Sequence, residues 1–279
     1  MSPDPKKAEI RNRRVKGAGS INGACLPKPV WRVRPLIASH LVAIIILASW
    51  LLPVSRSWWD QLDVAVFRLL NGSLRLGEWW QMLWALANHR LSDVLSAMLI
   101  LLLILSWLWG RPRDIQNLKC AAFGAFALFA GAVLLLLHPV IRRGFDYTRP
   151  GPSLVVDEAL RLTTLVPSID AKDADRSSFL GDHAFILITI ALFFIYLGPR
   201  RFAIAASILA FIFTMPRLVG GAHWLTDDVI GGVVPALLVV SWLLATPLGY
   251  YMAKKFLPLV KFIVALIPER LRIPERTVS

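Results

Sequence analysis

Long apolar segments alternate with polar segments along this chain. The apolar runs cover residues 35–53, 93–110, 118–141, 183–198, 201–221 and 228–249. Most of them approach the roughly 20 residues that an α-helix needs to cross the hydrocarbon core of a bilayer. The fourth run is shorter, and it suffices if its polar start lies in a cavity lined by protein. The pattern predicts an all-α polytopic membrane protein with six transmembrane helices.

The remaining segments flank or interrupt this domain of residues 35–249. Residues 1–34 are polar and basic without an apolar period, which predicts a disordered tail. Residues 54–92 are amphipathic and rich in tryptophan, which favours helices in the outer interface. Their tryptophans fit an aromatic belt that anchors the protein better than a grip on lipid substrate. Residues 250–279 form a basic amphipathic tail, which we expect on the inner leaflet.

Composition adds an orientation to this topology. The chain has 279 residues, of which 56% are hydrophobic, and a formal charge of +13. Nine Lys and Arg residues precede residue 35, and six follow residue 249. Because cytoplasmic segments carry an excess of Lys and Arg, both termini are predicted to be cytoplasmic. Two cysteines, Cys25 and Cys120, cannot make a disulfide framework, so we interpret them as free thiols.

Under this topology the unusual ionisable residues gather on the outer face. They lie in the loops 142–182 and 217–227 and at the helix ends next to these loops. The residues are Arg142, Arg143, Arg149, Asp182, His183, Arg217, His223, Asp227 and Asp228. Residues far apart in the sequence are therefore expected to meet at one depth of the membrane.

The residue types in this group suit phosphate chemistry. Several arginines at one place suggest a multidentate anion, because the guanidinium fork matches phosphate oxygens. Asp227 follows His223 by four residues, so one helical turn would let the carboxylate accept a bond from one imidazole nitrogen. The other nitrogen would then be free as a nucleophile. His183, at a predicted helix start, could donate a proton to a leaving group.

Each of these features also has a plainer explanation. A histidine at a helix start is often a cap, a His–Asp pair is often a surface pair, and interfacial arginines commonly reach for lipid headgroups. The convergence of all of them on one face favours catalysis. A metal site made of Asp182, His183, His223 and Asp227 is the other specific possibility, but the surrounding arginines would repel a divalent cation.

Three segments carry a family resemblance. They are "RRGFDYTRP" (142–150), "SFLGDHA" (178–184) and "PRLVGGAHWLTD" (216–227). These segments resemble the three signature motifs of the type 2 phosphatidic acid phosphatase superfamily, a six-span membrane fold related to the vanadium haloperoxidases. Arg142 stands where the first motif has lysine, and Pro216 stands where the third has serine. The second motif has Leu180, Gly181 and Asp182 before its histidine in place of Pro-Ser-Gly.

The "GDHA" segment, with "KDADRSSF" before it, resembles one branch of this superfamily, the bacterial lipid A 1-diphosphate synthases. The resemblance implies a phosphotransferase in the bacterial inner membrane with its active site on the periplasmic side. Undecaprenyl diphosphate would be the donor and the 1-phosphate of lipid A the acceptor. It implies no metal, no soluble cofactor and no nucleic acid.

The resemblance also implies roles for the residues. His223 would attack the terminal phosphorus and form a phosphohistidine, Asp227 would orient it, and His183 would protonate the leaving group. Phosphate binding falls to the arginines and the second motif, namely Arg142, Arg149, Arg217, Gly181 and Asp182.

Two further functions remain open at the level of sequence. A hydrolase that releases phosphate from undecaprenyl diphosphate or another lipid differs only in that water reaches the phosphohistidine. A non-catalytic lipid-binding or transport protein with the same fold is disfavoured by the intact His223–Asp227 pair and by the arginines. Asp182 is the remaining puzzle, because a carboxylate should repel phosphate. It either caps the helix that begins there, which we slightly favour, or raises the pKa of His183.

Overall fold

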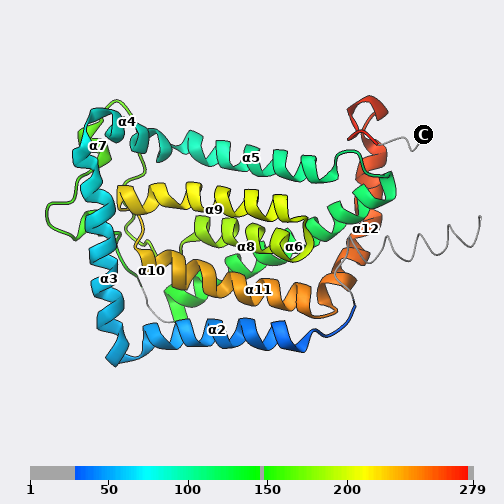
Figure 1. The fold of residues 1–279 in the computed structure, drawn as a ribbon, viewed down its shortest axis with the longest axis horizontal. Coiled ribbons are helices and arrows are strands. Elements are labelled where there is room, and N and C mark those ends of the chain that lie inside the picture. The colour runs from blue at the N-terminus through cyan, green and yellow to red at the C-terminus, as the bar shows by residue number, and fades with distance from the viewer. Residues whose placement is uncertain (1–28, 145–147, 276–279) are drawn as a thin grey trace, which may run out of the picture.

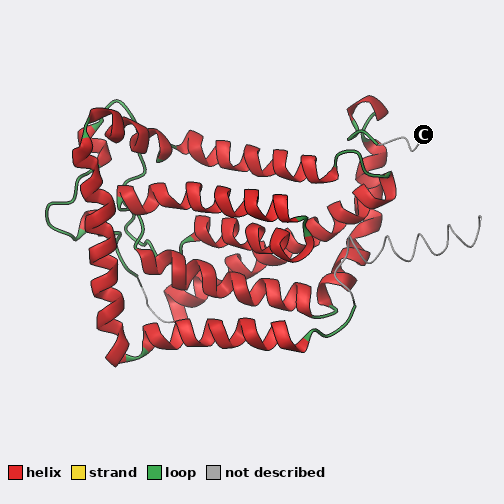
Figure 2. Cartoon of the chain, viewed as in Figure 1, coloured by secondary structure: helices red, strands yellow, loops and turns green. Residues whose placement is uncertain are grey.

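The computed structural model describes residues 29–144 and 148–275. The helices of these residues pack into one bundle. The helices are α2 (Val33–Leu51), α3 (Pro53–Gly72), α4 (Glu78–Ala87), α5 (Arg90–Leu108), α6 (Arg113–Pro139), α7 (Leu162–Leu165), α8 (Asp182–Leu197), α9 (Arg200–Gly220), α10 (Leu225–Asp228), α11 (Val234–Ala245) and α12 (Leu248–Leu266). Within the described residues there is no strand, only one isolated bridge between His89 and Ala171 (Figure 2).

The long helices run side by side along the molecule (Figure 1). Helix α8 packs against α9 and α11, α2 lies along α11, and α12 packs against α6. Helix α3 crosses one end of the bundle and α12 lies at the other end (Figure 1). The described chain begins and ends at the α12 end, opposite α3 (Figure 1).

Within residues 29–144 and 148–275, five helical segments are long and apolar enough to cross a membrane. They are Val33–Leu51, Arg90–Leu108, Arg113–Pro139, Arg200–Gly220 and Leu225–Ala245. The prediction of an all-helical membrane protein with several spans is confirmed. The fourth predicted run is α8, an apolar helix of 16 residues, and its role as a sixth span stays a prediction.

The core of the bundle is aromatic. Phe185, Phe193 and Phe194 of α8 are fully buried. The ring of Trp107 on α5 meets Phe193 edge-on with 5.8 Å between ring centroids, and Phe126 on α6 lies 4.8 Å from Phe193. Edge-to-face and tilted pairs at these distances are favourable arrangements for aromatic rings. The cluster fixes α5, α6 and α8 relative to one another, and these helices carry site residues at their ends.

Helix α3 lies within the amphipathic segment 54–92 and turns an unusual face to the bundle. Its buried residues are Asp63, Phe67 and Asn71, which follow one another at four-residue spacing and so form one stripe. The Asn71 amide donates to the carbonyl oxygens of Val219 (3.0 Å) and Leu160 (2.9 Å). Helix α3 is therefore bonded to the end of α9 through polar groups. The placement of this segment in the membrane interface stays a prediction.

The two tails are described only in part. Residues 1–28, which include most of the predicted basic tail and Cys25, lie outside the described residues. Cys120 is a free thiol. After α12 the chain returns to the start of α6, where Arg113 pairs with Glu275 at 2.8 Å and the Gln116 amide donates to the Pro274 carbonyl at 3.1 Å. The predicted inner-leaflet position of α12 stays a prediction.

Candidate active site

The site begins with the turn that ends α9. The carbonyl of Arg217 accepts bonds from the backbone N–H groups of Gly221 (3.1 Å), Ala222 (3.0 Å) and His223 (3.2 Å). Gly221 has a φ of +82°, in the left-handed region that favours glycine. A Cβ there would also lie 2.8 Å from the ring of Phe67. This compact turn holds His223 directly beyond Arg217, as the six-residue spacing in the third motif suggested.

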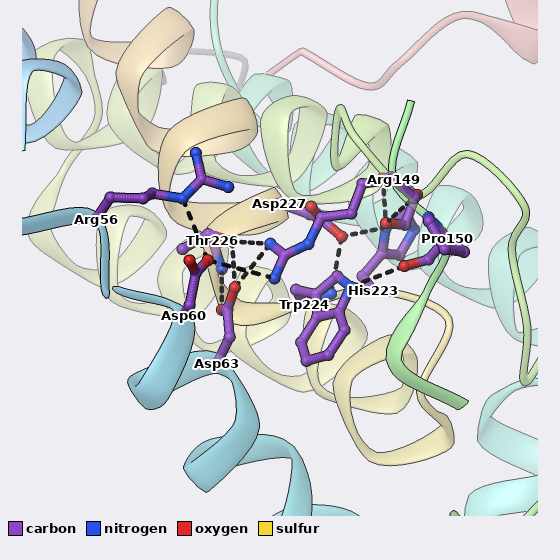
Figure 3. Close-up of polar contacts among 10 residues, drawn as sticks. Arg56, Asp60, Asp63, Arg149, Pro150, His223, Trp224, Thr226 and Asp227 are labelled. Atoms are coloured by element: carbon purple, nitrogen blue, oxygen red, sulfur yellow. Dashed lines mark hydrogen bonds and ion pairs between the residues drawn. The ribbon is translucent and has the colours of Figure 1, made fainter. Parts of the chain in front are cut away.

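His223 is almost completely buried and has one defined tautomer. Its Nδ1 lies 2.8 Å from the carbonyl oxygen of Ser178. Because a carbonyl oxygen only accepts, Nδ1 carries the proton and Nε2 has the lone pair. Asp227 Oδ2 lies 3.7 Å from Nδ1 and accepts the backbone N–H of Trp224 at 2.8 Å (Figure 3). The expected hydrogen bond from the imidazole to Asp227 is thus made to Ser178 instead.

Asp227 still acts on His223 through its charge. Burial alone lowers the pKa of the His223 imidazole. The interaction with Asp227 and the charges of neighbouring carboxylates outweigh burial, and the net effect raises this pKa above 6.5. Asp227 is fully buried, and its Oδ1 has no partner among the described residues. The pair therefore stabilises a positive imidazole ring, which is the form that a phosphorylated histidine resembles in charge.

Arg149 belongs to a second polar cluster next to His223. Its Nη1 donates to Asp63 Oδ2 at 2.7 Å and to Thr226 Oγ1 at 2.8 Å, and its guanidinium lies 4.3 Å above the ring of Trp224 (Figure 3). The Arg149 carbonyl accepts from the backbone N–H of Ser178 at 2.8 Å. A backbone hydrogen bond thus joins the first motif to the second. The Ser178 carbonyl in turn accepts the bond from Nδ1 that orients His223.

Arg217 and His183 meet at a carboxylate that the sequence reading missed. Asp93, in the first turn of α5, lies 2.9 and 3.0 Å from Nη2 of Arg217 and 3.1 Å from Nε2 of His183. Arg217 Nη1 donates to the carbonyls of Asn88 (3.3 Å) and Lys172 (3.4 Å). Asp63 was missed in the same way. Both aspartates lie in or next to amphipathic segments, where they look like solvent-facing residues.

Gly181 and Asp182 contact other residues of the protein in ways that the predicted phosphate-binding role did not include. The Gly181 N–H donates to the Asp227 carbonyl at 3.1 Å, and a Cβ on Gly181 would lie 2.5 Å from Asp228 Oδ1. The N-cap residue of α8 is Gly181, and Asp182 is the first residue of the helix. Its carboxylate lies 2.7 Å from Nε2 of His138 at the end of α6. The favoured cap explanation of Asp182 is therefore wrong.

The remaining predicted residues are placed less completely. Arg142 lies in the turn Val140–Gly144 that follows α6, and its side chain is outside the described part of the chain. Among the described residues, no group of three or more His, Cys, Asp or Glu side chains is placed to hold a metal ion. The structure brings Arg149, His183, Arg217, His223 and Asp227 to the end of the bundle that α3 crosses (Figure 1).

Comparison with known proteins agrees with this geometry. A family model described as the PAP2 superfamily matches residues 122–251, which include all three motifs. Residues 122–251 are therefore similar to the PAP2 superfamily. It is also 29% identical over 214 residues to lipid A 1-diphosphate synthase of Escherichia coli (strain K12), a span that covers 77% of this chain and 88% of that protein. No solved structure matches the chain.

These comparisons fix the class of the protein. The resemblance to the lipid A 1-diphosphate synthase branch of the PAP2 superfamily is confirmed. The PAP2 domain, the related enzyme and the apolar helices together identify a multi-pass membrane protein with a function of the lipid phosphatase or lipid phosphotransferase type.

Proposed function

We propose that the chain transfers the terminal phosphate of undecaprenyl diphosphate to the 1-phosphate of lipid A. The observation that carries the proposal is the state of His223. Its Nδ1–H is engaged by the Ser178 carbonyl, and its Nε2 has no hydrogen bond among the described residues. A buried imidazole with one fixed proton and one lone pair is arranged as a nucleophile.

The reaction has two steps at His223. In the first, the Nε2 lone pair attacks the terminal phosphorus, an N–P bond forms, and the bond to the bridging oxygen breaks to release undecaprenyl phosphate. His183 donates its Nε2 proton to the leaving oxygen and regains a proton from the attacking phosphate monoester in the second step. In the second, an oxygen of the lipid A 1-phosphate attacks the phosphorus, the N–P bond breaks, and neutral His223 returns. Arg149 and Arg217, with Arg142, stabilise the charge on the transferred group.

We place this site on the periplasmic side of the bacterial inner membrane, with both termini in the cytoplasm. Two observations support this orientation. The described ends of the chain lie at the end of the bundle opposite the site (Figure 1). The basic residues Lys254, Lys255 and Lys261 of α12 also belong to that end (Figure 1).

The test uses the purified full chain in detergent with undecaprenyl diphosphate labelled at its terminal phosphate. The proposal expects label in lipid A when lipid A is present and an acid-labile phosphoenzyme when it is absent. Mass spectrometry of the product then decides between the 1- and 4′-positions. Release of labelled inorganic phosphate at one rate, with or without lipid A, would assign the hydrolase instead.

Two histidine variants separate the nucleophile from general damage. His223→Gln is expected to abolish both the phosphoenzyme and the transfer. His40→Gln is the matched control, because His40 also bonds a carbonyl oxygen, that of Leu36 at 2.9 Å, but lies in α2 away from the site. Substantial transfer by His223→Gln would show that another residue is the nucleophile.

A further inference from the structure

Asp93 holds the position of an anion between two of the proposed phosphate-site residues. Its carboxylate oxygens lie 2.9 and 3.0 Å from Nη2 of Arg217, and Oδ1 also lies 3.1 Å from Nε2 of His183. Because a carboxylate accepts only, the Nε2 of His183 carries the proton in this arrangement. A guanidinium N–H and an imidazole N–H that converge on one pair of oxygens form a binding place for an oxyanion.

The three partners differ in their freedom to move. Arg217 is buried, and its Nη1 is held by the carbonyls of Asn88 and Lys172. The side chains of Asp93 and His183, by contrast, are 39% and 35% exposed. The hydroxyl of Ser96 donates to the backbone carbonyl of Asp93 rather than to its carboxylate. The carboxylate can therefore leave while Arg217 stays in place.

We propose that Asp93 is a specificity-determining residue whose carboxylate holds the phosphate position beside Arg217 and His183 and is displaced by substrate. An incoming phosphate must compete with an anion that is already bonded to Arg217 and His183. A lipid with one phosphate gains little by this exchange, because it replaces one anion with another. A diphosphate brings a second charged group, and the exposed Lys172, whose backbone is held at Arg217, offers a cation on this side of the site.

Asp93 thereby favours lipid diphosphates over lipid monophosphates. The inference rests on the proposed phosphoryl-transfer site, but it does not require lipid A as the acceptor. A residue that only positioned Arg217 and His183 would have the opposite effect on anion affinity. Its loss would disorder the two donors and weaken phosphate binding. The sign of the change in phosphate affinity therefore separates competition from support.

The experiment measures the full-length protein in detergent with three anions. They are inorganic phosphate as an inhibitor, phosphatidic acid as a monophosphate substrate, and undecaprenyl diphosphate. For Asp93→Asn we expect the inhibition constant of inorganic phosphate and the KM of phosphatidic acid to fall by about tenfold, the factor that one charge-assisted hydrogen bond commands. The KM of undecaprenyl diphosphate is expected to fall by a smaller factor.

Asp170→Asn is the control for the change of charge alone. Asp170 is exposed, lies in the same outer loop as Lys172, and has no hydrogen bond to a site residue among the described residues. Asp93→Glu retains the carboxylate and is expected to gain no phosphate affinity. If Asp93→Asn does not yield folded protein, Asp93→Ser tests the same sign. An unchanged or weakened affinity for phosphate in any folded neutral variant, or an Asp170→Asn effect of equal size, overturns the proposal.

Failure of the proposed function would be recognised separately. If labelled lipid A never forms but undecaprenyl diphosphate is hydrolysed, the transferase is wrong and the Asp93 comparison proceeds on hydrolysis. If no lipid turns over, stabilisation of the full chain by inorganic phosphate in thermal unfolding reports the same affinities. Stabilisation that is greater in Asp93→Asn than in the unmodified protein supports the inference, and stabilisation that is equal or smaller refutes it.

Discussion

Replacement of Asp63 by alanine should damage both stability and activity, although Asp63 lies outside all three motifs. Asp63 is 1% exposed and accepts three bonds. They come from Arg149 Nη1 (2.7 Å), Thr226 Oγ1 (2.7 Å) and the Thr226 backbone N–H (2.9 Å), as Figure 3 shows. Loss of the carboxylate would remove the hydrogen bonds between α3 and Thr226 of α10 and leave Arg149 with fewer acceptors.

The magnitude follows from burial and from the bonds lost. Burial raises the pKa of the Asp63 carboxyl, against the bonds from Thr226 and Arg149 that lower it, so the intact cluster stabilises by less than the sum of its bonds. Loss of one partner from a buried ion pair nevertheless costs about 3–5 kcal/mol. The Arg149 side chain is 16% exposed and can recruit water. We therefore expect a loss near the lower limit, about 3 kcal/mol.

Asp60 provides the control on the same helix. It lies one turn before Asp63, and its carboxylate is 3.9 Å from Arg149, but its side chain is 49% exposed. Because exposed pairs contribute little, Asp60→Ala is expected to cost about 0.5 kcal/mol or less. The assay is equilibrium unfolding in mixed micelles, together with kcat/KM for lipid diphosphate. Equal losses for Asp60→Ala and Asp63→Ala would refute the reasoning from burial.

Three further predictions concern the motifs. Because the pKa of His223 is raised above 6.5 and the neutral ring is the nucleophile, kcat/KM should rise with pH through that raised pKa, and Asp227→Asn should move the rise to lower pH. Gly181→Ala should abolish activity, since its Cβ would lie 2.8 Å from the carbonyl oxygen of Asp227, which cannot move without α10; activity near that of the unmodified protein would contradict this. Asp182→Asn and His138→Gln should each destabilise by less than about 1 kcal/mol because both side chains are partly exposed, and unfolding of the double variant should show a coupling between them.

The bundle was largely predictable because its signal is local. A run of about 20 apolar residues can satisfy its backbone in a bilayer only as a helix, so each run reports its own structure. The ends of the helices were predicted less accurately than their centres. The run predicted from residue 93 begins as a helix at Arg90, because the polar residues of a first turn carry no apolar signal. Successive spans place alternate loops on the same side of the membrane. This alternation predicted that the motif residues gather, namely Arg149, His183, Arg217, His223 and Asp227.

The partners of these residues were not predictable in the same way. Asp63 has a polar neighbour three residues earlier and reads as part of a solvent-facing stripe, and its burial arises only when α3 docks across the end of the bundle. Asp93 has the position of an acid in the first turn of a helix, where the dipole alone explains it. The tautomer of His223 is fixed by the backbone carbonyl of Ser178. Every residue type has this carbonyl, so the identity of residue 178 could not predict the bond.

These missed partners share a physical consequence. Two of the predicted cations of the site are paired with carboxylates, Arg149 with Asp63 and Arg217 with Asp93. Pairing lowers the cost of burying arginines, but it also reduces the positive charge offered to a phosphate. The two pairs are not equivalent, since Asp63 is fully buried whereas Asp93 is 39% exposed. The buried Asp63 carboxylate stays bonded to Arg149, whereas the exposed Asp93 carboxylate can be displaced from Arg217. The site therefore combines Arg149, whose counter-ion is buried, with Arg217, whose counter-ion the substrate must replace. Selectivity among lipid phosphates should depend on the pair of Arg217 and Asp93.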